Sequence, residues 1–363
     1  GVGARRLSLA AVTMPLLSWR GHFVRTHAMQ AFAGTSFDSL DSYALTELPV
    51  PEPGPGQVRL RVAATALGYV DGLMAQGRYQ IKPPLPYVPG GEIAGVLEAV
   101  GAGVSTLAVG DRVVTWQLGG GMADCVVVDA ADVDVVPGDL PLPMAAAMLV
   151  DYQTAHFALF ERGRLSAADR VLVLGAAGGV GAAAVALAAR AGAFVIAAAG
   201  ADDKRQAARA LGAQATVDYR QHDWREALKA CAPGGAVDVV VDPVGGDAFE
   251  PAFRSLAKEG RHLVLGFAGG AIGRLPANLA LLKNADLLGV DVRHFLATQP
   301  ERARQVRGSL FRRVRDGVLP LPGMTRFTLA QAADALRATL SRERRGKVVV
   351  VPQGGVADTG RLA

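Results

Sequence analysis

The stretch Val171-Leu-Val-Leu-Gly-Ala-Ala-Gly-Gly-Val-Gly181 decides the fold of this chain. A short apolar strand pattern runs into a glycine-rich turn, and an alanine-rich helical pattern follows. Gly175 permits the tight turn, Gly178 lets the backbone approach a pyrophosphate, and Gly181 allows the helix to pack closely on the strand. The amino end of that helix offers free N–H groups and a partial positive charge to phosphates. Together with a further strand pattern at 193–198, the stretch predicts a dinucleotide-binding β-α-β unit.

The residues after the second strand indicate which dinucleotide is bound. In such units an Asp or Glu about 20 residues beyond the glycines binds the ribose 2′-hydroxyl of NAD. Gly200 stands nineteen residues after the last glycine of the loop, so the carboxylate is missing there. Two acids, Asp202 and Asp203, follow and could compensate for it. Lys204 and Arg205 lie beyond them and could neutralise a 2′-phosphate or form only a solvated helix face. The missing carboxylate favours NADP over NAD.

Strand and helix patterns alternate around this unit from about residue 170 to residue 265. The strands are short and mostly apolar, as in VDVVV at 237–241. Such strands are typical of a parallel sheet that is covered by helices on both faces. We expect strands at 170–174, 193–198, 216–217, 237–241 and 261–265, and helices at 179–191, 202–211, 224–230 and 249–256.

The sequence before and after this region has a different character. In QVRLRVA at 57–63, polar and apolar residues alternate as in a half-buried strand, and the turn-dense segment PEPGPGQ precedes it. Further short strand patterns suggest a barrel-like β domain, and a helical segment without Pro or Gly leads out of it. The strands are expected at 91–100, 111–116, 124–128 and 347–351, and the helices at 144–161, 301–316 and 329–340.

The composition excludes several classes of protein. Of the 363 residues, 50% are hydrophobic and 20% are charged, which is typical of a globular protein rather than a disordered one. The clean apolar stretches are short, such as the eight residues 182–189, whereas a helix needs ~20 to cross a bilayer. Two cysteines cannot form a multi-bridge disulfide framework or a four-cysteine zinc site.

The positive charge of the chain is concentrated at its N-terminus. The whole chain has 38 Lys and Arg against 33 Asp and Glu, which gives a net charge of +5. Residues 1–28 contain four arginines and no acid, so the remaining residues have 34 basic and 33 acidic side chains. A nearly neutral body does not favour nucleic-acid binding.

Residues 1–28 allow three interpretations. They could be an arginine-containing targeting leader, or a secretory segment around 7–17, although Arg20 and Arg25 follow it and no A-x-A cleavage site is clear. They could also be an upstream extension that precedes a start at Met29, which we favour because a strand pattern begins there. We therefore exclude 1–28 from the fold, expect this extension or leader to be disordered, and expect the protein to be cytoplasmic.

Many co-linear motifs between residues 29 and 352 resemble the medium-chain dehydrogenase/reductase superfamily. Within it they look most like the zinc-free NADPH:quinone oxidoreductase branch, the zeta-crystallin-like proteins. The motifs are PGPGQVRLRV (53–62), KPPLPYVPGGEIAGVLEAVG (82–101), VGDRV (109–113), GAAGGVG (175–181), VDVVVDPVGGDAFE (237–250), GRHLVLGFAGG (260–270), LLKNADLLGV (281–290) and RGKVVVVP (345–352).

This resemblance implies an α/β protein in which a GroES-like β-barrel is joined to a Rossmann domain with a doubly wound parallel sheet. The GroES-like catalytic domain would span 29–150. The Rossmann NADP-binding domain would span 151–292, and the chain would return to the catalytic domain at 293–363. The resemblance also implies a homodimer.

The positions that bind zinc in other members of the superfamily are not kept. The zinc-binding members have a His in a Gly-His-Glu motif, whereas this chain reads Gly90-Gly91-Glu92. No cysteine lies near 68–71, and Cys125 and Cys231 are best interpreted as ordinary thiols. The six histidines show no metal-ligand spacing. The sequence therefore predicts no metal site.

The resemblance implies hydride transfer from C4 of NADPH to a quinone or to an activated alkene or carbonyl acceptor. The cofactor carries this chemistry, while the protein orients it and excludes water. The matching cofactor positions are, at the phosphates, Gly178, Gly179, Val180 and Gly181; near the 2′-phosphate and adenosine, Gly200, Lys204 and Tyr219; and near the nicotinamide, Thr154, Gly266, Phe267 and Ala268. Asp71 matches an acid that lines the cleft.

The substrate side departs from the pattern of the branch. The branch usually reads Asn-Pro-x-Asp-x-Tyr-x-x-x-Gly, but this chain reads GYVDGL at 68–73, without the Asn and the Tyr. Tyr69 is new and could partly replace them. Tyr79 matches a Gly-x-Tyr tyrosine that donates a proton in related enoyl reductases, or it is a loop residue that packs against 83–86. The catalytic candidates are therefore Tyr79, Asp71 and Tyr69.

Two other functions remain open from the sequence. The chain could reduce an enoyl thioester such as an enoyl-CoA, or an enal. Arginines on the expected helix at 301–316 could then bind the CoA phosphates, or they could form only a solvated face. The chain could also be a cofactor-binding or RNA-binding protein without enzymatic activity. We expect its partner to be a small-molecule electron acceptor, a quinone or an enone, and we expect neither a membrane nor a nucleic acid to be its partner.

Overall fold

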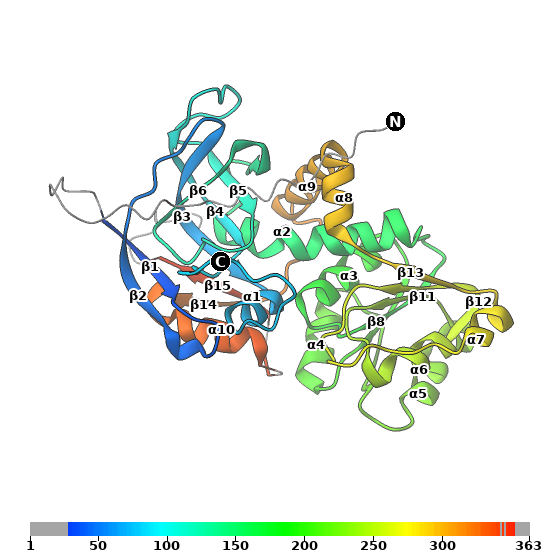
Figure 1. Ribbon diagram of the computed structural model, residues 1–363. Coiled ribbons are helices and arrows are strands. Elements are labelled where there is room, and N and C mark those ends of the chain that lie inside the picture. The colour runs from blue at the N-terminus through cyan, green and yellow to red at the C-terminus, as the bar shows by residue number, and fades with distance from the viewer. Residues whose placement is uncertain (1–27, 342, 345, 353–363) are drawn as a thin grey trace, which may run out of the picture.

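The computed structural model describes residues 28–341, 343–344 and 346–352. Apart from Ala28, the expected N-terminal extension or leader lies outside the described residues. Two bodies lie side by side in Figure 1, a β-barrel and an α/β body with a six-stranded parallel sheet. The expected combination of a barrel with a doubly wound parallel sheet is confirmed.

The barrel is formed by both ends of the chain. Its strands follow the order β14-β15-β3-β4-β5-β7, and β6 also pairs with β3. The last strand, β15, runs antiparallel to β3 with Val349 opposite Ala66, so the C-terminal segment closes onto the N-terminal one. The hairpin of β1 and β2 lies beside it. The bounds are β1 Ala28–Gly34, β2 Tyr43–Pro49, β3 Gln57–Leu67, β4 Glu92–Val100, β5 Arg112–Trp116, β6 Cys125–Asp129, β7 Val133–Val135, β14 Met324–Thr328 and β15 Lys347–Val351.

The parallel sheet of the α/β body has the order β10-β9-β8-β11-β12-β13. The strand order reverses between β8 and β11, and ligands of such sheets bind at the carboxyl ends of the strands beside this reversal. The glycine-rich loop leaves β8 at this point. The bounds are β8 Arg170–Leu174, β9 Phe194–Ala198, β10 Ala215–Val217, β11 Val237–Asp242, β12 Leu256–Val264 and β13 Asp286–Gly289.

Helices cover both faces of the parallel sheet because its strands are apolar on both sides. Val171 and Val173 point into a core that includes α3, whereas Leu172 and Leu174 belong to a second core with α5 and α6. In the described part of the chain, no helix is long and apolar enough to cross a bilayer. The bounds are α1 Tyr69–Ala75, α2 Leu142–His156, α3 Gly179–Arg190, α4 Asp202–Ala210, α5 Trp224–Cys231, α6 Phe249–Arg254, α7 Ala277–Lys283, α8 Val292–Thr298, α9 Pro300–Arg315 and α10 Ala332–Leu340.

Helix α2 joins the two bodies. It packs on strands β3, β4, β5 and β15 of the barrel and on α3 and α9 at the α/β body, as Figure 1 shows. The expected helix at 144–161 is interrupted, because α2 ends at His156 and one wider π turn continues it over Phe157–Arg162. Its alanines Ala145, Ala146 and Ala155 are completely buried, so the helix can approach both neighbours closely.

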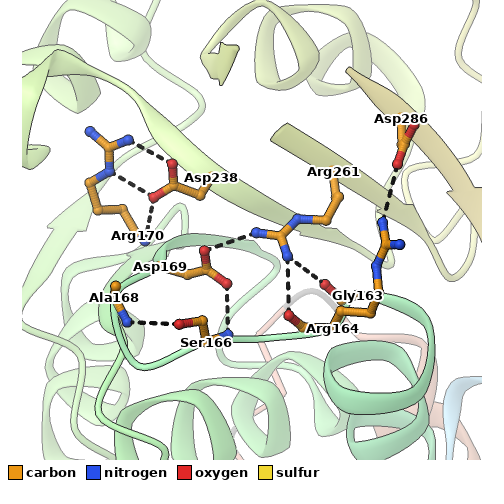
Figure 2. Close-up of polar contacts among 9 residues, drawn as sticks. All are labelled: Gly163, Arg164, Ser166, Ala168, Asp169, Arg170, Asp238, Arg261 and Asp286. Atoms are coloured by element: carbon orange, nitrogen blue, oxygen red, sulfur yellow. Dashed lines mark hydrogen bonds and ion pairs between the residues drawn. The ribbon is translucent and has the colours of Figure 1, made fainter. Parts of the chain in front are cut away.

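Charged side chains tie together the amino ends of the parallel strands, at the opposite end from the glycine loop (Figure 2). The Arg170 guanidinium binds both carboxylate oxygens of Asp238, at 2.7 Å from Oδ1 and 2.8 Å from Oδ2. Arg261 reaches Asp169 at 2.9 Å. Although burial alone raises it, the hydrogen bonds from Arg170 hold the pKa of Asp238 below its ordinary value. These ion pairs hold the amino end of β8 against β11 and β12.

We expect Asp238→Ala to lower the free energy of unfolding by about 1–3 kcal/mol, because a half-buried guanidinium loses its bidentate partner. Asp286→Ala is the matched control, since that carboxylate is largely exposed and lies 3.5 Å from Arg164. The control should cost less than about 1 kcal/mol. Urea unfolding measures both values, and equal losses would show that the ion pair of Arg170 with Asp238 contributes no more than a surface ion pair.

Candidate functional site

The glycine loop forms a cradle at the carboxyl end of β8. Gly175 has a φ of +58°, which favours glycine, and Gly178 caps helix α3 without a side chain. A Cβ on Gly181 would overlap the carbonyl oxygen of Gly175, so only glycine lets α3 start this close to the strand. Val180 and Gly181 lie in the first turn of α3, as expected for a phosphate-binding loop.

A carboxylate from α2 lies against the first residue of α3. A Cβ on Gly179 would overlap Oδ2 of Asp151, so glycine is required there as well. Asp151 is buried, and three residues later on the same helix stands Thr154, which is half-buried. The structure therefore brings the predicted nicotinamide residue Thr154 close to the predicted phosphate loop. The acid between them was not found from the sequence.

An arginine occupies the space beside Gly200 at the end of β9. A Cβ on Gly200 would lie 2.5 Å from Nε of Arg220. The Arg220 side chain is 62% exposed, and its guanidinium donates to both oxygens of Asp218, which also pairs with Arg205. Arg205 also pairs with Asp202 at 3.3 Å, so two guanidinium groups and two carboxylates balance one another at this point, where the sequence lacks the acid that selects NAD.

The other predicted residues of this end of the site lie nearby. Lys204 is in the first turn of α4, and Tyr219 immediately precedes Arg220. Lys204 lines a cavity of about 290 Å³ together with Ala177 of the glycine loop. Gly323 and Gly346 of the barrel line its other side. The cavity therefore opens between the phosphate loop and the barrel.

Two loops meet at the ends of β11 and β12, where the resemblance places the nicotinamide. Gly266, Phe267 and Ala268 follow β12, and the Ala268 N–H donates to the carbonyl of Pro243 at 3.1 Å. At the end of β11, Oδ1 of Asp242 accepts hydrogen bonds from the N–H groups of Val244 and Gly245, each at 2.8 Å.

A buried acid–imidazole pair supports these loops. Nε2 of His262 lies 3.0 Å from Oδ2 of Asp242, and neither residue is exposed to solvent. His262 also stacks on Phe253 and contacts the tilted ring of Phe249. The sequence showed only that the histidines lack metal-ligand spacing, so the pairing of His262 with Asp242 was not predicted. His262 lies within the motif GRHLVLGFAGG, and nothing in this motif indicates that Asp242, twenty residues earlier, is its partner.

On the barrel side, Asp71 joins two segments of backbone. Its Oδ2 accepts from the Gly68 N–H at 2.7 Å and its Oδ1 accepts from the Gly91 N–H at 3.1 Å. Burial raises the pKa of Asp71, although these hydrogen bonds and Lys347 counteract the effect. Tyr69 is half-buried in the first turn of the same helix, α1. The carboxylate is thus largely engaged by the protein itself.

Tyr79 packs against an apolar cluster within the barrel. The cluster contains Met74 and Tyr87, and Phe37 packs against it as well. Tyr79 as a whole is half-buried. The structure places Tyr69 and Asp71 together on α1 and places Tyr79 in the loop that follows this helix.

The barrel and the α/β body also share a buried charge cluster. Nζ of Lys347 lies 2.5 Å from Oε1 of Glu92 and 2.8 Å from Oδ2 of Asp151. Burial and repulsion by Asp151 raise the pKa of Glu92 to about 8, although Lys347 lowers it in part. Burial opposes protonation of Lys347, but the two carboxylates hold its pKa above the ordinary value. One ammonium therefore faces two carboxylates at the junction of the bodies.

The arginines of α9 do not form a free basic rim. Arg302 pairs with Glu161, and Arg304 and Arg307 both pair with Asp134. Arg315 pairs with Asp316. Arg304 also pairs with Glu301, so four acids offset most of the charge of the six arginines that the sequence suggested for binding CoA phosphates. The solvated-face interpretation fits this helix better.

The position of the missing zinc ligand has no room for a side chain. A Cβ on Gly91 would overlap the carbonyl oxygen of Gln117 on the neighbouring strand segment. Among residues 28–341, 343–344 and 346–352, no group of three or more His, Cys, Asp and Glu side chains is arranged to hold a metal ion.

Comparisons with known proteins agree with this architecture. Residues 54–138 match the alcohol dehydrogenase GroES-like domain family, and residues 179–307 match the zinc-binding dehydrogenase family. Quinone oxidoreductase-like protein 2 of Rattus norvegicus is 38% identical over 303 residues, which are 83% of this chain and 86% of that protein.

Solved structures show the same fold. The quinone oxidoreductase of Escherichia coli complexed with NADPH superposes with a TM-score of 0.82 at 25% identity, over 89% of this chain and 100% of that one. The CurK enoyl reductase superposes with a TM-score of 0.79 at 26% identity, over 90% of this chain and 99% of that one.

A GroES-like barrel joined to a doubly wound sheet with a glycine loop defines an oxidoreductase of the medium-chain dehydrogenase/reductase superfamily. Within that superfamily, the chain belongs to the quinone oxidoreductase-like family.

Proposed function

We propose that this enzyme is a zinc-independent, NADPH-dependent reductase of a quinone or of an activated alkene or carbonyl compound. The observation that carries the proposal is the end of β9, where the acid that would select NAD is absent and Arg220 fills the space over Gly200. A guanidinium binds phosphate in a bidentate manner, so this position suits a 2′-phosphate.

The residues present fit such a dinucleotide. The cradle of Gly178 and Gly181 leaves backbone exposed to a pyrophosphate, and the first turn of α3 supplies N–H groups. When bound, NADPH supplies the hydride at C4 of its nicotinamide ring. The chain's own part is to hold the two ends of the molecule, through Arg220 and Lys204 at one end and the loop at 266–268 at the other.

The absence of room at Gly91 supports a zinc-independent reaction. A histidine there would have to displace the backbone of Gln117. The reducible group of the acceptor would then be activated by hydrogen bonds and by exclusion of water rather than by a metal. Tyr69, Tyr79 and the segment around Asp71 are the candidates for these contacts.

Reduction of an enoyl thioester is the second candidate function. The likeness to the CurK enoyl reductase favours it. The neutralised arginines of α9 argue against a CoA-binding rim on that helix. The non-enzymatic alternative is set aside because the family is one of oxidoreductases.

We expect wild-type enzyme to oxidise NADPH with a much higher kcat/KM than NADH when a quinone or enone is present. Arg220→Ala should lower kcat/KM for NADPH about 10- to 100-fold, the value of one charge-assisted contact, and should leave NADH almost unchanged. Arg225→Ala is the control, because that arginine is exposed on α5. A wild-type preference for NADH would overturn the cofactor assignment.

If Tyr79 donates the proton to the carbon beside the carbonyl of an enone, Tyr79→Phe should lower kcat for the enone about 10²-fold. Turnover of a quinone should barely change, since its reduced oxygen can take a proton from water. Tyr69→Phe is the comparison, and it should be mild for both acceptors. Equal, small effects of Tyr79→Phe on both acceptors would leave Tyr79 with a packing role.

We also propose that the enzyme is a homodimer that associates through the edge of its parallel sheet. Strand β13 pairs only with β12 in the described part of the chain, so its outer edge has no partner there. The neighbouring apolar side chains are exposed, Leu281 at 81%, Leu282 at 68% and Leu287 at 45%. An exposed apolar edge strand is a surface that a second copy can cover.

A double substitution, Leu282→Asp with Leu287→Asp, should convert a dimer into a monomer of about half the mass. Light scattering after size exclusion measures this, with 37.6 kDa as the mass of one chain. Val109→Asp is the control, since Val109 is 65% exposed on the barrel. A wild-type protein that elutes as a monomer would refute the proposal.

A further inference from the structure

The charge cluster at the junction of the two bodies reaches the phosphate loop. Lys347 begins β15, and its ammonium is held between Glu92 of β4 and Asp151 of α2. Only 3% of the Lys347 side chain and 4% of the Glu92 side chain are exposed. Three elements that are far apart in sequence are thus tied at one buried point.

Asp151 is the member of the cluster that faces the dinucleotide site. Its Oδ2 lies where a Cβ of Gly179 would be, at the first residue of α3. The amino end of this twelve-residue helix is where a pyrophosphate would be bound. A bare carboxylate at this place would repel the pyrophosphate, because two negative charges would share one low-dielectric pocket.

We propose that Lys347 is a positioning residue for the cofactor: by binding Asp151 it cancels the charge of the carboxylate that lies beside the phosphate loop. This inference rests on the proposed dinucleotide function of the loop. It adds a requirement that the glycine motif does not contain, namely a cation supplied by the last strand of the barrel. The two bodies must therefore be docked for the pyrophosphate site to be complete.

Glu92, the second carboxylate of the charge cluster, makes the net charge of this cluster depend on pH. Glu92 is faced by Lys347 from β15, by Asp151 from α2 and by Asp71 from α1, and the Val150 N–H donates to its Oε2 at 3.0 Å. Burial is the main reason that the pKa of Glu92 is raised to about 8. Below that pH, Lys347, Asp151 and a protonated Glu92 sum to zero charge. Above it the three groups carry one negative charge near the pyrophosphate.

The first test compares NADPH dissociation constants, measured by calorimetry at pH 7, for wild type, Lys347→Met and the double variant Lys347→Met with Asp151→Asn. We expect Lys347→Met to weaken NADPH binding about 10-fold or more, since it exposes the pyrophosphate to an uncancelled carboxylate. The double variant should recover most of the lost affinity, because the carboxylate is gone as well.

Adenosine 2′-monophosphate is the matched control ligand. It occupies the 2′-phosphate end of the site, beside Arg220, and has no pyrophosphate. Its dissociation constant should be the same in wild type and in Lys347→Met, which shows that the variant is folded. If Lys347→Met weakens both ligands equally, or if the double variant stays as weak as the single one, the positioning role is refuted.

The second test needs no change at Lys347 and so covers the case in which that variant does not fold. In wild type the NADPH dissociation constant should rise several-fold between pH 7 and pH 9, as Glu92 loses its proton. In Glu92→Gln this rise should be absent. The same rise in both proteins would refute the charge cancellation. A wild type that binds neither NADPH nor adenosine 2′-monophosphate would refute the proposed function as well as the positioning role of Lys347.

Discussion

The packing of α2 between the barrel and the α/β body is the constraint on which the rest of the structure depends. One continuous apolar core runs from Ala64 and Ala94 of the barrel strands, through Ala146 of α2, to Val171 and Ala184 of the α/β body. Because many members of this core are small alanines, small shifts of either body would open voids. The core therefore fixes how the glycine loop faces the barrel.

The polar part of this junction was not predictable from the sequence. Lys347 and Glu92 are 255 residues apart and Lys347 and Asp151 are 196 apart, so no local pattern connects them. All three are charged residues in mostly apolar elements, and charged residues are normally exposed. Only the closure of β15 onto β3 shows that they share one buried point.

The elements themselves could be predicted where periodicity was strong. The five strands expected in the α/β body are present with shifts of one or two residues at most ends, because a strand buried on both faces is an apolar run. Strand β12 extends further, from Leu256 to Val264, and β13 was missed because only Leu287 and Leu288 mark it as apolar. Arg220 was missed because its position over Gly200 depends on how the loop after β10 folds back.

Asp71 holds together two segments of the barrel, 68–71 and 90–92, which carry no metal ligands in this chain. In the zinc-binding members these are the two segments that a metal would join. Here one carboxylate accepts from the Gly68 N–H and from the Gly91 N–H, so it holds the two segments together directly. Two charge-assisted hydrogen bonds favour the ionised carboxylate and oppose the raised pKa that burial of Asp71 imposes. Asp71 can thus be required for the geometry of the barrel without exchanging a proton with a substrate.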